Sequence, residues 1–147
     1  MKRLTTGLLI ALLAVLSGCA SGPKFRDIHS SIAPSESETG RIYFYRPGKM
    51  FGAGIQPKVW LNGEVVGKST PGGFFYVDQE PGNCTVSMTS EVEKELTFTI
   101  DRGQTRYVRL SVGLGVVVYR VYPELKDESE ALPEIQSMSY IGTTEEK

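Results

Sequence analysis

The sequence is poor in the residue types on which most hydrolytic enzymes and metal sites depend. Among 147 residues it holds one histidine, His29, and two cysteines, Cys19 and Cys84. A Ser-His-Asp or Cys-His catalytic set would therefore have to use His29. A zinc site made of Cys and His would lack ligands. We expect no catalytic residues, no bound metal and no cofactor.

The sequence also lacks an excess of either charge. Its 16 Lys and Arg residues face 17 Asp and Glu residues, whereas nucleic-acid proteins carry a basic surplus that neutralises phosphates. We therefore expect no nucleic-acid partner. What the chain does contain is 16 Gly, 8 Pro, 7 Tyr and 6 Phe residues, a composition typical of short strands and turns.

The beginning of the chain has the pattern of a lipoprotein signal. A positively charged start precedes an apolar run at residues 7–16. At ~1.5 Å rise per residue, this run covers about half of a ~30 Å hydrocarbon core, so we expect a signal peptide rather than a membrane span. The following Leu16-Ser17-Gly18-Cys19 resembles the lipobox of bacterial lipoproteins. That resemblance implies that the chain is cleaved before Cys19 and that acyl chains such as palmitate are attached to Cys19.

The residues after Cys19 bear on the destination of the protein. In Gram-negative lipoproteins an Asp at this place usually retains the protein in the inner membrane, and here Ala20 and Ser21 follow. By this resemblance we expect the periplasmic face of the outer membrane, with the bilayer as a partner through the N-terminal lipid. Cys84 then remains as the free thiol, and we expect it to be buried as a small apolar side chain.

Composition divides the chain into four parts. Residues following Cys19 are rich in Ser, Pro and charge and show no periodicity, which is typical of a flexible spacer. The end of the chain holds seven acidic and two basic residues from Glu124 onward. The expected parts are a signal peptide at 1–18, a lipidated tether at 19–39, a β domain at 40–123 and an acidic tail with a short helix at 124–147.

The central part has the pattern of an all-β domain. Short β-type runs alternate with turn residues, among them Asn62-Gly63, which suits a two-residue type I′ hairpin. This spacing predicts an antiparallel β-sandwich of about eight short strands. The period-two pattern directs Cys84 and Phe98 into its core. The expected strands are residues 41–46, 58–61, 64–67, 74–78, 83–90, 95–101, 105–112 and 116–122.

The tail carries the signal of one short helix. Asp127 has the character of an N-cap, with the acidic Glu130 three residues later. Leu132 and Ile135, and Met138 beyond them, have the spacing of a face that packs against the sandwich. Pro133 would disturb this helix or mark a second start.

Several turn and core motifs between residues 40 and 123 carry a family resemblance: Tyr45-Arg46-Pro47, Asn62 and Gly63 with Gly67, Pro81-Gly82, and Gly103 with Tyr107 and Val108. This region resembles the PEGA-type module of carbohydrate and envelope proteins and, more closely, a family of small bacterial lipoproteins with a domain of unknown function. The resemblance implies an immunoglobulin-like or prealbumin-like β-sandwich and supplies no catalytic residues.

Alternation on two strands predicts a possible binding surface. If Ile42, Phe44, Val108 and Leu110 face the core, their neighbours face outward, provided that the first and seventh strands lie near each other. Tyrosines beside an arginine suit recognition of a protein or a glycan. The alternative is ordinary cross-strand pairing on a solvated sheet. The residues of this predicted surface are Tyr43, Tyr45, Tyr107 and Arg109.

One Gly-rich loop, residues 48–54, contains an apolar pair, Met50 and Phe51. Either the pair tucks under the edge of the sandwich, or it contacts lipid or a partner.

These patterns together favour a membrane-anchored envelope lipoprotein that acts as a non-enzymatic binding or scaffolding module. Its partner would be another envelope protein or a glycan. The alternative is an envelope enzyme, or an enzyme inhibitor, acting on peptidoglycan or glycan. A pocket with two facing carboxylates would favour the enzyme, whereas a Tyr and Arg surface would favour binding.

Overall fold

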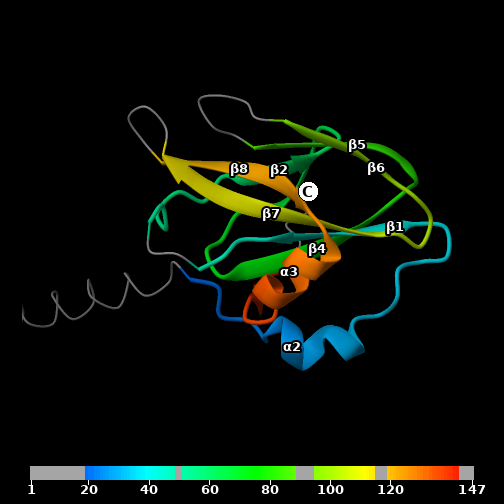
Figure 1. Ribbon diagram of the computed structural model, residues 1–147, viewed down its shortest axis with the longest axis horizontal. Helices are drawn as coiled ribbons and strands as arrows, with labels where there is room; N and C mark the ends of the chain where they lie inside the picture. The colour runs from blue at the N-terminus through cyan, green and yellow to red at the C-terminus, as the bar shows by residue number, and fades with distance from the viewer. Residues whose placement is uncertain (1–18, 49–50, 89–94, 115–118, 143–147) are drawn as a thin grey trace, which may run out of the picture.

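The computed structural model describes residues 19–48, 51–88, 95–114 and 119–142 (Figure 1). The expected signal peptide at 1–18 lies outside these residues, as do Met50 and the first part of the last expected strand, residues 116–118. The described chain forms two packed β-sheets, which confirms the predicted β-sandwich.

The first sheet has five strands, in the spatial order β8 (Tyr119–Lys126), β7 (Thr105–Leu114), β1 (Gly40–Tyr45), β4 (Gly73–Gln79) and β9 (Ser139–Tyr140). Strand β1 therefore lies at its centre. The pairing of β1 with β4 is antiparallel, but β1 runs parallel to β7, and β4 runs parallel to β9. The sheet is therefore mixed rather than purely antiparallel.

The second sheet has four strands, and its pairs are antiparallel. Asn62 and Gly63 join two of them, with φ angles of 52° and 88°. Both angles are positive, as a type I′ hairpin requires, so the Asn-Gly signal in the sequence is confirmed. In spatial order this sheet consists of β3 (Glu64–Lys68), β2 (Lys58–Leu61), β5 (Gly82–Met88) and β6 (Leu96–Ile100).

The main core fills the space between the two sheets. Strand alternation directs one face of each sheet inward, as the sequence pattern predicts. Cys84 is buried as expected, whereas Phe98 is only partly buried at the edge of this core. The fully enclosed members are Ile42, Phe44, Val59, Leu61, Phe75, Cys84, Val86, Met88, Ile100, Val108, Leu110 and Val121.

A helical layer covers the outer face of the five-stranded sheet. It consists of α2 (Phe25–Ile28), the 3-10 helix η2 (His29–Ser31) and α3 (Glu128–Ile135) (Figure 1). A second apolar cluster lies beneath this layer, so the sheet is buried on both faces over part of its area. Its buried members are Phe25, Tyr43, Tyr45, Phe74, Tyr107, Ala131, Ile135 and Met138.

The segment between Cys19 and β1 differs from the flexible spacer expected at residues 19–39. Phe25 is 4% exposed and packs in the second cluster. Its backbone N–H donates to the carbonyl of Met138 at 2.9 Å, and the Lys24 Nζ donates to the Ser139 hydroxyl at 3.0 Å. Phe25, an apolar residue in a polar segment, therefore packs this segment against the sheet. His29 is exposed.

The expected C-terminal helix is present as α3. Asp127 stands at the N-cap with extended backbone, but its side chain makes no capping hydrogen bond. Pro133 lies inside the helix rather than at a second start. Ile135 and Met138 are buried against the outer face of the sheet, which confirms the predicted apolar face.

Within the described residues, no helix combines the length and the apolar character needed to cross a membrane.

Candidate functional site

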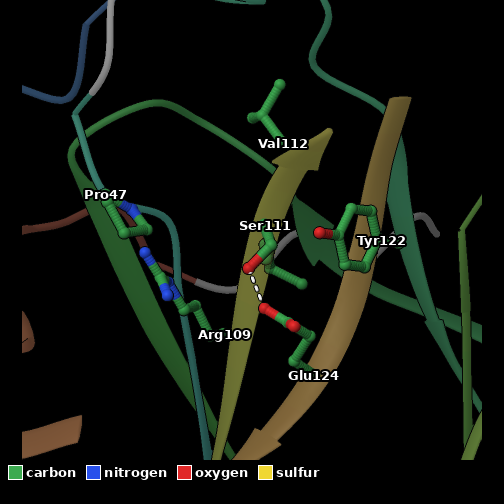
Figure 2. Close-up of a pocket in the computed structure, with 7 residues that line it drawn as sticks. Pro47, Arg109, Ser111, Val112, Tyr122 and Glu124 are labelled. Carbon is green, nitrogen blue, oxygen red and sulfur yellow. Dashed lines mark hydrogen bonds between the residues drawn. The ribbon is translucent and has the colours of Figure 1, made fainter. Parts of the chain in front are cut away.

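A polar pocket lies on the outer face of β7 and β8, beside the helical layer. It encloses about 260 Å³, and the described residues of its walls include one cationic and one anionic side chain. Figure 2 shows Ser111 and Glu124 directed toward each other over the two strands, with Arg109 extending toward Pro47. The residues labelled there are Pro47, Arg109, Ser111, Val112, Tyr122 and Glu124.

Strand register brings the polar side chains of the pocket together. In the antiparallel β7–β8 pair, Arg109 lies opposite Glu124, and Ser111 lies opposite Tyr122. Alternate residues of a strand share a face, so these side chains point away from the main core, into which Leu110 is directed. The Ser111 hydroxyl donates a hydrogen bond to the Glu124 carboxylate (Figure 2). This bond fixes the carboxylate within the pocket.

Arg109 connects the pocket to α3. Its Nε lies 3.4 Å from Oε2 of Glu134, an ion pair without hydrogen-bond geometry. Within the described part of the chain, this Nε is buried and makes no hydrogen bond. A guanidinium has five N–H donors, so Arg109 retains donor capacity for a ligand's carboxylate, carbonyl or hydroxyl oxygen.

Glu134 also binds β1. The Tyr45 hydroxyl donates to Glu134 Oε2 at 2.9 Å. Burial and this hydrogen bond to the carboxylate raise the pKa of Tyr45, because both disfavour the phenolate. One carboxylate of α3 thus holds a buried tyrosine and orients the arginine of the pocket.

The exposed aromatic surface expected from Tyr43, Tyr45, Tyr107 and Arg109 is not formed. The two premises hold, since β1 and β7 are neighbours and the alternate residues Ile42 and Phe44 face the main core. The helical layer, however, covers the tyrosines. Tyr43, Tyr45 and Tyr107 are buried, with exposures of 8%, 0% and 6%, and Arg109 lines the pocket.

The buried tyrosines make ordered ring contacts instead. The Tyr43 and Tyr107 rings stack across the parallel strand pair, with centroids 5.5 Å apart and an interplanar angle of 12°. The ring of Phe25 meets Tyr43 edge-on at 5.7 Å. Burial, helped by the charge of Glu128, raises the pKa of Tyr107 to about 12. These residues therefore hold the helical layer on the sheet.

Arg46 is a buried cation for which the sequence pattern indicates no functional role. It is 1% exposed, and its Nη1 and Nη2 donate to the carbonyls of Ile55, Ser69 and Gly52 at 2.6, 2.8 and 2.7 Å. Burial lowers its pKa. In the sequence, the Tyr-Arg-Pro motif marks this position as a family feature. The motif does not indicate that the arginine lies buried within a loop.

A second cavity lies on the outer face of β5 and β6. It encloses about 400 Å³ and is lined by Asn83, Thr85, Thr97, Phe98 and Thr99, none of which is charged. The first pocket carries a fixed cation and a fixed anion, so it offers the stronger recognition chemistry.

Metal ligands do not gather anywhere in the described residues, where no group of three or more His, Cys, Asp or Glu side chains could hold an ion. Cys19 is exposed at the surface.

Comparison with known proteins assigns the family. Residues 36–122 match the family described as "Protein of unknown function (DUF2846)", which spans more than half of the chain, so the chain belongs to that family. A protein of Haemophilus influenzae described as "Uncharacterized protein" is 25% identical over 137 residues, covering 89% of this chain and 80% of the relative. No solved structure matches the chain.

Proposed function

We propose that this member of the DUF2846 family is a lipid-anchored protein of the bacterial envelope with a non-enzymatic binding role. Acyl chains on Cys19 would hold it at the periplasmic face of the outer membrane. The pocket between Arg109 and Glu124 would bind a polar group of another envelope protein or of a glycan. The resemblance of the sequence to lipoprotein and PEGA-type modules supports the same role.

The observation that carries the anchoring is the position of Cys19. The lipobox-like tetrapeptide Leu16-Ser17-Gly18-Cys19 precedes the folded part directly, and the backbone N–H of Ala20 already donates to the carbonyl of Pro71 at 3.3 Å. Cys19 is exposed beside this contact. Acyl chains there would project from the domain surface without disturbing either core.

The binding role rests on the chemistry of the pocket. Arg109 offers N–H donors and Glu124 offers acceptor oxygens, both held by protein contacts before any ligand arrives. Preorganised charged groups of this kind favour binding because little side-chain freedom is lost on association. The alternative, an enzyme acting on glycan, uses two carboxylates that face each other. Among the described residues that line the pocket, Glu124 is the one carboxylate.

The anchoring is tested by the mass of the N-terminal peptide from the membrane fraction. We expect a peptide that begins at Cys19 and carries acyl mass. A Cys19→Ala variant should lose both the cleavage and the acylation. Free, unmodified Cys19 in the wild-type protein would contradict the anchoring.

The binding role is tested by photo-crosslinking in intact cells, with benzoylphenylalanine in place of Tyr122 in the pocket. The matched control carries the same group in place of the exposed Glu64 on the other sheet. We expect a crosslinked partner from position 122 that is lost when Arg109→Gln is added. Equal crosslinking from both positions, unaffected by Arg109→Gln, would contradict a role of the pocket.

A further inference from the structure

Large apolar side chains are exposed mainly at one end of the molecule. In the described residues, five such side chains are exposed, and four of them belong to the loop after β1 or to the paired ends of β7 and β8. Single exposed apolar residues are ordinary, whereas grouped ones mark a contact surface. The four are Phe51 (67%), Leu114 (79%), Tyr119 (38%) and Ile55 (38%), and the fifth is Leu125 (38%), near the far end of β8.

Three of these side chains form one patch, which we call the apolar tip: Phe51, Leu114 and Tyr119. Leu114 lies opposite Tyr119 in the β7–β8 pair. The rings of Phe51 and Tyr119 have centroids 6.0 Å apart. The loop also packs on β7, since a Cβ at Gly52 would lie 2.8 Å from Cγ1 of Val112. The tip therefore joins a loop and a hairpin into one surface.

Buried Arg46 holds the loop that carries Phe51. Its guanidinium donates to the carbonyls of Gly52 and Ile55 within the loop and to that of Ser69 beneath it. These carbonyl dipoles offset a cation that lies away from water. Phe51 is thus presented to solvent next to a backbone that Arg46 holds from inside at Gly52 and Ile55.

Cys19 lies at the same end of the molecule as the apolar tip. Ala20 bonds to the turn at Pro71, and the N–H of Gly72 in that turn donates to the carbonyl of Arg46 at 2.9 Å. Arg46 in turn binds the loop of Phe51. Figure 1 shows the start of the described chain, this loop and the Leu114 end of β7 on one side of the molecule.

We propose that the apolar tip inserts into the interfacial region of the same bilayer leaflet that takes the acyl chains on Cys19. This inference rests on the anchoring proposed above and adds a second point of contact, made by the folded domain itself. Exposed Phe and Leu side chains partition into the acyl boundary, and Tyr places its hydroxyl at the headgroup level. Two contacts at one end fix the orientation of the domain on the membrane.

The test measures the depth of single tryptophans in the lipidated full-length protein, reconstituted in vesicles of phosphatidylethanolamine and phosphatidylglycerol. Native Trp60 is first replaced by Phe, which costs no hydrogen bond because its Nε1 has none among the described residues. Tryptophan is then placed by Leu114→Trp at the tip or by Leu125→Trp as the matched control. Quenching by brominated acyl chains reports contact with lipid.

We expect brominated vesicles to lower the emission of the Leu114→Trp protein by about twofold or more and to leave that of the Leu125→Trp protein nearly unchanged. Phe51→Trp provides a second probe at the tip and should be quenched in the same way. Equal quenching at positions 114 and 125 would overturn the inference. The inference would also be overturned if the tip were not quenched and a photo-crosslinker placed at position 114 in cells captured a protein.

The anchoring and the insertion of the tip are distinguished in the same preparation. Acyl mass on the N-terminal peptide and flotation with the vesicles report the anchor alone. A floating, acylated protein whose tip is not quenched would overturn the insertion and leave the proposed anchoring intact. A protein without acyl mass that does not float would overturn both.

Discussion

The ring of Phe75 occupies the space that a side chain at Gly67 would fill. A Cβ at residue 67 would lie 2.4 Å from Cζ of Phe75, well inside contact distance. Gly67 on β3 therefore has no room for a methyl group, and the main core closes against its backbone.

We expect Gly67→Ala to lower the free energy of unfolding by about 1–3 kcal/mol, the usual cost of an overpacked core. Urea denaturation of the chain produced without residues 1–18 measures this change. The double variant Gly67→Ala with Phe75→Leu should recover part of the loss, because the smaller side chain leaves room for the methyl group. A Gly67→Ala protein of unchanged stability would contradict the close approach.

The hydrogen bond from Tyr45 to Glu134 predicts a measurable contribution to stability. Tyr45→Phe removes a hydrogen bond to a charged group, for which we expect a loss of about 1.5–3 kcal/mol. The exposed variant Tyr119→Phe serves as the control and should change stability by less than about 0.5 kcal/mol. Equal effects of the two substitutions would show that the bond contributes nothing to the docking of α3.

Stability should fall in alkaline solution because the buried tyrosines resist ionisation. The pKa of Tyr107 rises to about 12, and that of Tyr45 is also raised, whereas unfolded tyrosine ionises near pH ~10. The stabilisation is complete below pH ~10, and it is lost as pH rises, since the unfolded chain then binds fewer protons than the native one.

Urea titrations at neutral pH and near the pKa of Tyr107 measure this alkaline loss. Tyr107→Phe should make stability less dependent on pH above the ordinary tyrosine range, whereas Tyr119→Phe should leave the dependence as it is. An unchanged pH dependence in Tyr107→Phe would contradict the burial of its hydroxyl.

The thiol of Cys84 should react slowly in the native protein. Cys84 is 1% exposed in the main core, and burial raises the pKa of its thiol, so both access and thiolate formation are limited. In a Cys19→Ser protein, the rate of reaction with a bulky disulfide reagent measures Cys84 alone. Native labelling as fast as labelling in urea would contradict the burial.

Local signals predicted most of the fold, as β1 and its neighbours illustrate. Turn residues such as Asn62-Gly63 and period-two runs place strands with little dependence on distant residues. The burial of Tyr43 and Tyr45 depends on α2 and α3, which come from the two ends of the chain. A strand buried on both faces is nevertheless typical of a run made only of large apolar and aromatic residues, such as Ile42-Tyr43-Phe44-Tyr45.

The candidate site could not be predicted from the sequence in the same way, because it depends on the register between strands. Composition places Glu124 in an acidic tail, whereas β8 continues to Lys126 and sets Glu124 opposite Arg109. The partner of Arg109 on the other side, Glu134, comes from a helix. No local pattern indicates that these residues meet, so the pocket follows from tertiary structure.

The central position of β1 has a consequence for how the chain folds. β1 is the first strand in the sequence, yet its parallel partner β7 follows five others, with Arg41 placed beside Thr105. Pairing strands so distant in sequence closes long loops and slows folding. In a chain that emerges N-terminus first, β1 therefore keeps one unpaired edge until β7 has emerged, and the five-stranded sheet is complete only after β8 and β9 have followed.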